Sequence, residues 1–241
     1  MNHLIENNRI QPFENDQSTY KMSFSVFRAT SENTDDKVLQ VSEELFTLHR
    51  KSVCVYCASS TQIDEKYFRA AEELGSLIAQ NGLRLITGAG KLGLMNTIQD
   101  AALAAGGEAV GVIPTFMVNE GWHHEGLTQL IETASMHERK QTMADLSNGI
   151  IALPGGCGTM EELLEIITWK QLGLYLNPIV ILNIDGYYDA LLAQLATAVE
   201  ENFMRSIHAD IWSVATTPKE AIELLLNTPK WDKNIRKFAA I

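Results

Sequence analysis

Residues 149–173 read GIIALPGGCGTMEELLEIITWKQLG, an apolar run followed by a glycine-rich loop and a segment with helical periodicity. An apolar run without polar alternation is typical of a strand that is buried on both faces. Pro154 and the glycines indicate a tight connection between this strand and the helix. The stretch therefore predicts a strand–loop–helix unit, the repeating element of a parallel α/β sheet.

The same alternation extends along the chain. Further strands are expected at 52–58, 83–88, 108–114, 177–185 and 211–217. Helices are expected at 65–82, 94–107, 131–147, 187–203 and 218–227, the first of them closed by Gly82. Short connections between alternating elements predict a doubly wound, mainly parallel, Rossmann-like α/β sheet. In such sheets, ligands bind beyond the carboxyl ends of the strands at the switch point.

The predicted domain organisation has three parts. Residues 1–45 form a polar N-terminal extension, and a helical pattern runs over 35–51 near its end. The Rossmann-like domain covers 46–228, and 229–241 form a C-terminal tail.

Composition limits the function classes. With 46% hydrophobic residues and a net charge of −11, the chain is not expected to bind nucleic acid or anionic membranes, which require a cationic face. No apolar run reaches the roughly 20 residues of a membrane span, and the polar start differs from a secretory signal. Three cysteines suit a reducing compartment, so a cytoplasmic location is expected.

Cys54 and Cys57 form a C-x-x-C pattern inside a predicted strand. Residues three apart in a strand point to opposite faces, so we expect two small buried side chains there. No second C-x-x-C completes a zinc site.

The first glycine loop, GAGKLG at 88–93, matches G-x-G-x-x-G between a strand and a helix. A nicotinamide dinucleotide site would also need an acid at the end of the next strand, which here ends in Ile113, Pro114 and Thr115. A dinucleotide is therefore not expected. A loop that faces phosphate or packs closely and a purely structural turn both remain open.

The second glycine loop precedes a helix, where backbone N–H groups and the helix dipole together favour phosphate. Its candidate phosphate-binding residues are Gly155, Gly156, Gly158 and Thr159. The alternative is structural, because Thr159 and Glu162 have the T-x-x-E spacing of a capping box.

Helical geometry distinguishes the two glutamates that follow this loop. At about 100° per residue, the main buried face is expected to contain Met160, Leu163, Leu164 and Ile167. Glu161 falls on the polar face and is expected to be solvated. Glu162 falls on a second apolar face, where an acid must cap the helix, be paired or line a site.

The segment MHERK, residues 136–140, supplies a candidate partner for that acid. Met136 and Met143 share a helix face, and Arg139 and Lys140 lie between them. A cation on an apolar face needs an anion, which could be Glu162, a phosphate or a structural carboxylate. A functional site and a structural ion pair both remain open. His123 and His124 lack the spacing of metal ligands and are interpreted as part of a loop.

Several motifs resemble one family. PGGCGTMEE at 154–162 resembles the P-G-G-x-G-T-x-x-E signature of the LOG ("lonely guy") family, whose members are often mislabelled lysine decarboxylases. MHERK, GAGKLGLM at 88–95, CASS at 57–60 and NIDGYYD at 183–189 resemble other family segments, and the match covers about 52–226. Ala58, Ala89 and Asn96 replace usual glycines, and the segment 122–124 differs from plant-type members.

The resemblance implies hydrolysis of the N-glycosidic bond of a purine nucleoside 5′-monophosphate, either AMP or a cytokinin-type nucleotide. The products are the free base and ribose 5-phosphate. By the resemblance, Glu162 and Arg139 are catalytic, the loop 155–159 holds phosphate, and Gly90, Met136 and Lys140 lie at the substrate. A carboxylate suits this chemistry because positive charge develops on the ribose.

The resemblance also implies a homodimer or larger homo-oligomer that needs no metal or cofactor. A lysine decarboxylase is not expected, because no lysine has a recognisable pyridoxal-phosphate context. The alternative is a carrier that binds a nucleotide or molybdenum cofactor without hydrolysing it. A carrier needs the glycine loops but not the pair of Glu162 and Arg139.

Overall fold

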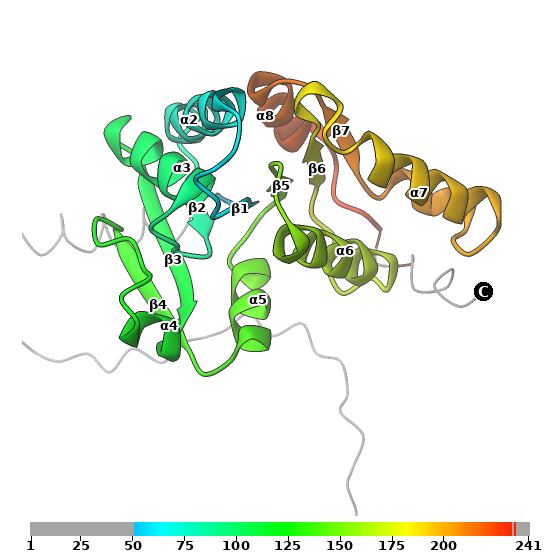
Figure 1. Cartoon of the computed structure of the whole chain (residues 1–241). Helices are drawn as coiled ribbons and strands as arrows, with labels where there is room; N and C mark the ends of the chain where they lie inside the picture. The colour runs from blue at the N-terminus through cyan, green and yellow to red at the C-terminus, as the bar shows by residue number, and fades with distance from the viewer. Residues whose placement is uncertain (1–50, 233, 235–241) are drawn as a thin grey trace, which may run out of the picture. The chain divides into compact units, whose positions relative to one another are not determined.

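A parallel sheet of seven strands organises the part of the chain described by the computed structural model, residues 51–232 and 234 (Figure 1). The strand order is β4-β3-β2-β1-β5-β6-β7, and every neighbouring pair is parallel. The strands are β1 (Ser52–Tyr56), β2 (Arg84–Thr87), β3 (Glu108–Pro114), β4 (Gln129–Thr133), β5 (Ile150–Ala152), β6 (Ile179–Leu182) and β7 (Ser213–Ala215). The predicted extension 1–45 and, apart from Lys51, the helical pattern over 35–51 lie outside the described residues.

Helices cover both faces of the sheet, which confirms the predicted doubly wound fold (Figure 1). One face packs against α2 (Glu65–Gln80), α3 (Gly93–Ala104) and α8 (Pro218–Asn227). The other packs against α5 (Met136–Asp145), α6 (Cys157–Gln171) and α7 (Asp189–Glu200). The short α4 (Thr115–Asn119), η1 (Ile184–Gly186) and η2 (Ser206–Asp210) lie in connections. No helix of the described segments is long and apolar enough to cross a membrane.

Strand side chains alternate between the two cores. Cys54 belongs to the core beneath α5, α6 and α7, whereas Cys57, just after β1, belongs to the core beneath α2, α3 and α8. Both thiols are free and buried, as expected for residues three apart along an extended chain.

Local sequence signals fix most helix ends. Ser135 Oγ accepts from the Glu138 N–H (3.1 Å), and Glu138 accepts from the Ala134 N–H (2.7 Å), so a capping arrangement begins α5. Gly82 lies just past α2 with φ +67°, the left-handed conformation expected of a glycine that ends a helix. Helix α6 begins after Gly156, and no described side chain caps it.

One predicted element is wrong at its start. The helix expected over 131–147 begins only at Met136, and Gln129–Thr133 form the edge strand β4. The stretch pairs with β3, for example Gly111 with Leu130, and this pairing outweighs the helical periodicity of its sequence. The connection between β3 and β4, which contains the predicted loop with His123 and His124, also contains α4.

The topology places a crevice at the centre of the sheet. From β1 the chain proceeds outward through β2 and β3 to β4, then returns to add β5 on the opposite side of β1. The connections that leave β1 and β5 therefore diverge at their carboxyl ends, which is the switch point of a doubly wound sheet.

Candidate active site

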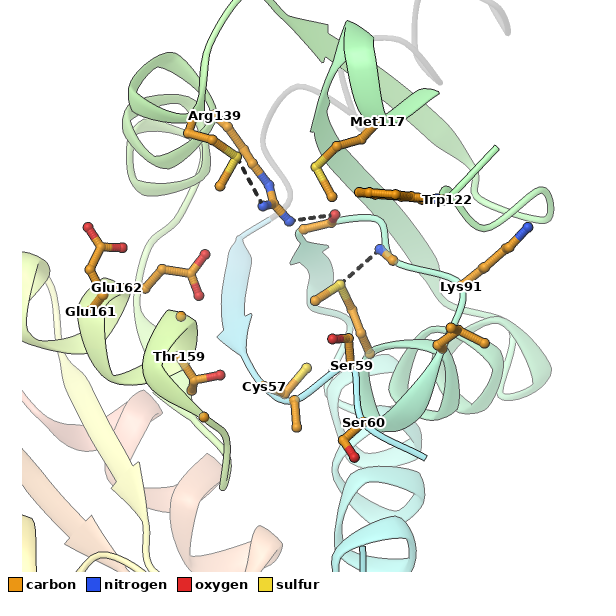
Figure 2. Close-up of a pocket in the computed structure, with 18 residues that line it drawn as sticks. Cys57, Ser59, Ser60, Lys91, Met117, Trp122, Arg139, Thr159, Glu161 and Glu162 are labelled. Carbon is orange, nitrogen blue, oxygen red and sulfur yellow. Dashed lines mark hydrogen bonds between the residues drawn. The ribbon is translucent and has the colours of Figure 1, made fainter. Parts of the chain in front are cut away.

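A cavity of about 550 Å³ opens at this switch point (Figure 2). Its walls come from the segments that follow β1, β2, β3 and β5, from the first turns of α3 and α5, and from the first two turns of α6. The predicted site residues among its lining are Gly90, Met136, Arg139, Gly156, Gly158, Thr159 and Glu162. The sheet therefore brings together side chains from both glycine loops and from the MHERK segment.

The N-terminus of α6 forms one side of the cavity. Gly156 precedes the helix, and Gly158 and Thr159 lie in its first turn. A Cβ atom added at Gly156 or Gly158 would meet no atom within 4 Å, so the space around this turn is open. Uncapped first-turn N–H groups and the positive end of the helix dipole make this side suitable for an anion.

Gly155 has a supporting position behind this turn. Its carbonyl accepts a 2.6 Å hydrogen bond from the Tyr187 hydroxyl, and a Cβ atom at Gly155 would collide with the Thr159 side chain. Gly155 is not among the residues that line the cavity. A glycine is required here because the backbone approaches Thr159 closely.

The predicted capping box between Thr159 and Glu162 is not formed. Helix α6 begins at Cys157, so Thr159 is its third residue and Glu162 lies in the second turn. The expected buried face is also partly wrong, because Leu164 is 40% exposed while Ile166 is 1% exposed. The helix buries one line of residues along the sheet, namely Thr159, Leu163, Ile166, Ile167 and Lys170. The structural alternative for Glu162 as a cap therefore does not hold.

Glu162 presents its carboxylate to the cavity (Figure 2). No hydrogen bond or ion pair joins it to another residue in the described segments. Burial raises the pKa of Glu162 to about 7, and the positive charge of Arg139 opposes that rise. Near neutral pH this group therefore exists in both its protonated and its ionised form, as a catalytic acid or base requires.

Arg139 is held by backbone carbonyls. Its Nε donates to the Val112 carbonyl (3.0 Å) and its Nη2 to the Gly88 carbonyl (2.7 Å), while the residue is only 7% exposed. A Cβ atom at Gly88 would collide with the guanidinium, so this position requires a glycine. Within the described residues, no N–O distance of 4 Å or less joins Arg139 to Glu162, so the two interact through their charges across the cavity.

Lys140 points elsewhere. Its ammonium is paired with Glu161 and with Glu165 (3.1 Å), and it does not line the cavity. Lys140 therefore forms a structural ion pair, which is one of the two alternatives left open by the sequence. Glu161, expected to be solvated, is a partly exposed partner of Lys140 that also contributes to the cavity wall.

The first glycine loop is fixed by a buried polar network. The Thr87 hydroxyl donates to Gln99 Oε1 (2.7 Å), and Gln99 Nε2 donates to the Gly90 carbonyl (2.9 Å). The Ala89 N–H donates to the Thr87 hydroxyl (3.2 Å), and Ala89 has φ +62°, a conformation that costs a residue with a side chain roughly 1–2 kcal/mol. The network holds the Gly88 carbonyl in the position where it accepts the hydrogen bond from Arg139.

The sequence did not identify the wall opposite α6. Met117 and Trp122 lie there, from the segment interpreted as a loop (Figure 2). Hydrogen bonds fix the segment to the first glycine loop, from the Lys91 N–H to the Trp122 carbonyl (3.0 Å) and from the His124 N–H to the Ala89 carbonyl (2.8 Å). The only signal available in the sequence was an aromatic residue in a polar segment.

The fold and the cavity define a Rossmann-like α/β protein with a small-molecule site at the switch point of its sheet. The family model described as "Possible lysine decarboxylase" matches residues 95–225. The chain belongs to this family, the LOG family, as its motifs indicated.

Curated relatives agree with this assignment. A probable cytokinin riboside 5′-monophosphate phosphoribohydrolase of Oryza sativa subsp. japonica is 42% identical over 67% of this chain and 65% of its own length. A cytokinin riboside 5′-monophosphate phosphoribohydrolase of Arabidopsis thaliana is 40% identical over 63% of this chain and 70% of its own length. The match with the rice protein thus covers slightly less than two thirds of that relative.

Solved structures share the fold. The molybdenum cofactor binding protein of Rippkaea orientalis superposes with a TM-score of 0.58 at 24% identity, covering 74% of this chain and 97% of that one. The Moco carrier protein of Chlamydomonas reinhardtii gives a TM-score of 0.54 at 26% identity, covering 73% and 94%.

Proposed function

We propose that this protein hydrolyses the N-glycosidic bond of a purine nucleoside 5′-monophosphate, AMP or a cytokinin-type nucleotide, to free base and ribose 5-phosphate. The observation that supports this most is the unpaired carboxylate of Glu162, whose pKa is about 7, in the same cavity as the uncapped end of α6. A phosphate at the helix end fixes one end of the substrate. The Glu162 carboxylate lies on the same side of the cavity as that helix end (Figure 2), and in this proposal it acts on the sugar.

In the proposed reaction, the bond between C1′ and the base nitrogen breaks and the base leaves with the bonding electrons. Ionised Glu162 stabilises the positive charge that develops on the ribose and accepts a proton from the attacking water. The water oxygen bonds to C1′. The proton released from water balances the proton that the departing base takes up.

Arg139 has an electrostatic part in this proposal. Its guanidinium is fixed by two carbonyls, so its charge keeps one position relative to Glu162. That charge lowers the pKa of Glu162 and so keeps a fraction of it ionised despite burial. Gly156, Gly158 and Thr159 hold the phosphate, Gly90 and Met136 line the substrate cavity, and Gly155 and Lys140 support the site from outside it.

A carrier without hydrolase activity is the second candidate, because solved structures of molybdenum cofactor carriers share this fold. A carrier requires a cavity and anion-binding loops, but it does not require an unpaired acid with a pKa near 7. Glu162 therefore favours the hydrolase. A homodimer and a cytoplasmic location complete the proposal, and the free thiols of Cys54, Cys57 and Cys157 are consistent with a reducing compartment.

A panel of nucleoside 5′-monophosphates, offered to the wild type and to Glu162→Gln, tests the proposal. Chromatography of the released base should show turnover of purine nucleotides by the wild type and almost none by the variant. Glu161→Gln is the matched control, because Glu161 pairs with Lys140 and should not be the reacting acid. Equal base release by Glu162→Gln and the wild type would exclude the assigned role of Glu162.

A further inference from the structure

The two sides of the cavity differ in chemistry. The side built by α6 contains Glu162, the Thr159 hydroxyl and backbone N–H groups. The opposite side presents Met117 and the indole of Trp122 (Figure 2). The Lys91 side chain extends away from the centre of the cavity in this view, although its residue contributes to the rim. A ligand with a charged end and a flat apolar end therefore matches both sides at once.

Trp122 is exposed yet held in place. The residue is 49% exposed and lines the cavity, so its side chain is accessible to a ligand there. The backbone N–H of Trp122 donates to the Met117 carbonyl (3.1 Å), and the backbone carbonyl of Trp122 accepts from the Lys91 N–H (3.0 Å). Two residues on, His124 pairs with Asp100 of α3 (2.8 Å). The backbone on both sides of the indole is thus anchored before any ligand arrives, which lowers the entropy cost of binding.

We propose that Trp122 is the platform on which the base stacks, so that this residue determines base preference. The inference rests on the proposed function and deepens it. A tryptophan face recognises a base by its aromatic area, not by the hydrogen-bonding groups on its edge. The site therefore selects nucleotides with a two-ring base over those with a one-ring base, while the α6 side recognises the phosphate that both share.

The experiment compares Trp122→Ala, Trp122→Phe and Trp122→Leu, with Phe203→Ala as a control at an exposed aromatic residue outside the cavity. Steady-state kinetics with AMP give KM and kcat, and ribose 5-phosphate serves as an inhibitor that lacks the base. Loss of stacking is worth about 1–3 kcal/mol, or roughly 5- to 150-fold in affinity. We expect Trp122→Ala to raise the KM for AMP by that factor with little change in kcat, because stacking acts equally on substrate and transition state.

Inhibition by ribose 5-phosphate should stay the same in every Trp122 variant. Trp122→Phe should recover most of the affinity for AMP, whereas Trp122→Leu should not, because it is apolar but not aromatic. The inference is overturned if the KM for AMP does not change, if ribose 5-phosphate inhibition weakens in parallel, or if Trp122→Leu performs as well as Trp122→Phe. Phe203→Ala should match the wild type in all three measurements.

Calorimetric binding separates this inference from the proposed hydrolysis. If the wild type binds AMP but releases no base, the hydrolase proposal fails, and weaker AMP binding by Trp122→Ala still supports stacking. If the wild type releases base and Trp122→Ala binds AMP equally well, stacking fails and the hydrolase proposal stands. If the wild type does not bind AMP, both fail.

Discussion

Replacing Glu162 with glutamine should stabilise the protein at alkaline pH. Burial raises the pKa of Glu162 from its ordinary 4.5 to about 7, so the folded protein holds a proton there that the unfolded chain releases at lower pH. Between these two values the contribution of this group to folding stability falls as pH rises, and above pH 7 the full cost of a buried carboxylate is present. Glutamine has a similar shape and no charge, so it removes that cost.

The size of the effect follows from the shift. A change from 4.5 to about 7 corresponds to about 3 kcal/mol at 1.36 kcal/mol per pKa unit. For a domain of this size, 1 kcal/mol moves the melting temperature by roughly 2–4 °C. We therefore expect Glu162→Gln to melt roughly 6–12 °C above the wild type at pH 8, with a difference that shrinks toward zero near pH 4.5.

Thermal melts of the wild type and the variant across this pH range test the prediction. Glu161→Gln is the control, because Glu161 is exposed and paired with Lys140; its charge adds to the raised pKa of Glu162 less than burial does, so its replacement should give a much smaller gain with pH than Glu162→Gln. If the difference between Glu162→Gln and the wild type did not depend on pH, or if the variant were less stable at pH 8, the carboxylate would not be desolvated as described.

Three further predictions concern the rest of the site. Adenosine should be turned over far more slowly than AMP in a base-release assay, because each charge-assisted hydrogen bond to phosphate is worth roughly 1.5–3 kcal/mol; equal rates would make the α6 loop structural. Arg139→Lys should lose one of the two hydrogen bonds to backbone carbonyls, which lowers the free energy of unfolding by about 1.5–3 kcal/mol. Turnover should also fall at temperatures well below the melting temperature. If unfolding accounted for the whole loss of turnover, Arg139 would have no catalytic role. Gly88→Ala should destabilise the protein by about 1–3 kcal/mol, because the added Cβ displaces the Arg139 guanidinium. Gly158→Ala should keep or raise stability but weaken phosphate binding. Melting curves and inhibition by phosphate distinguish the two variants.

Most of the fold was predictable because the strands and helices of a doubly wound sheet have recognisable local sequence patterns. Fully apolar runs such as those around Ile151 and Val180 are typical of strands between two helical layers, and Gly82 marks where α2 ends. The edge strand β4 escaped prediction because pairing with β3, a contact distant in sequence, determines its conformation. Five residues with a mixed pattern contain too little local information to compete with that contact.

The site was predictable where chemistry and helical geometry coincide. Glu162 was identified because an acid on an apolar helix face requires an explanation, and the cavity supplies one. The capping box with Thr159 was a false alternative, because the conformation of Gly156 starts the helix earlier than the side-chain pattern indicates. The role of Gly88 depends on a contact with Arg139 51 residues away, and Trp122 reaches the cavity only through its anchoring to the first glycine loop. Neither of these contacts can be inferred from spacing along the sequence.

Hydrolysis of AMP in water enriched in ¹⁸O tests the central claim most directly. Mass spectrometry of the products should show adenine and ribose 5-phosphate in equal amounts, with one ¹⁸O atom at C1 of the sugar, and Glu162→Gln should form neither product. Purified wild type that binds AMP without releasing adenine, or that places ¹⁸O only in inorganic phosphate, would contradict the account.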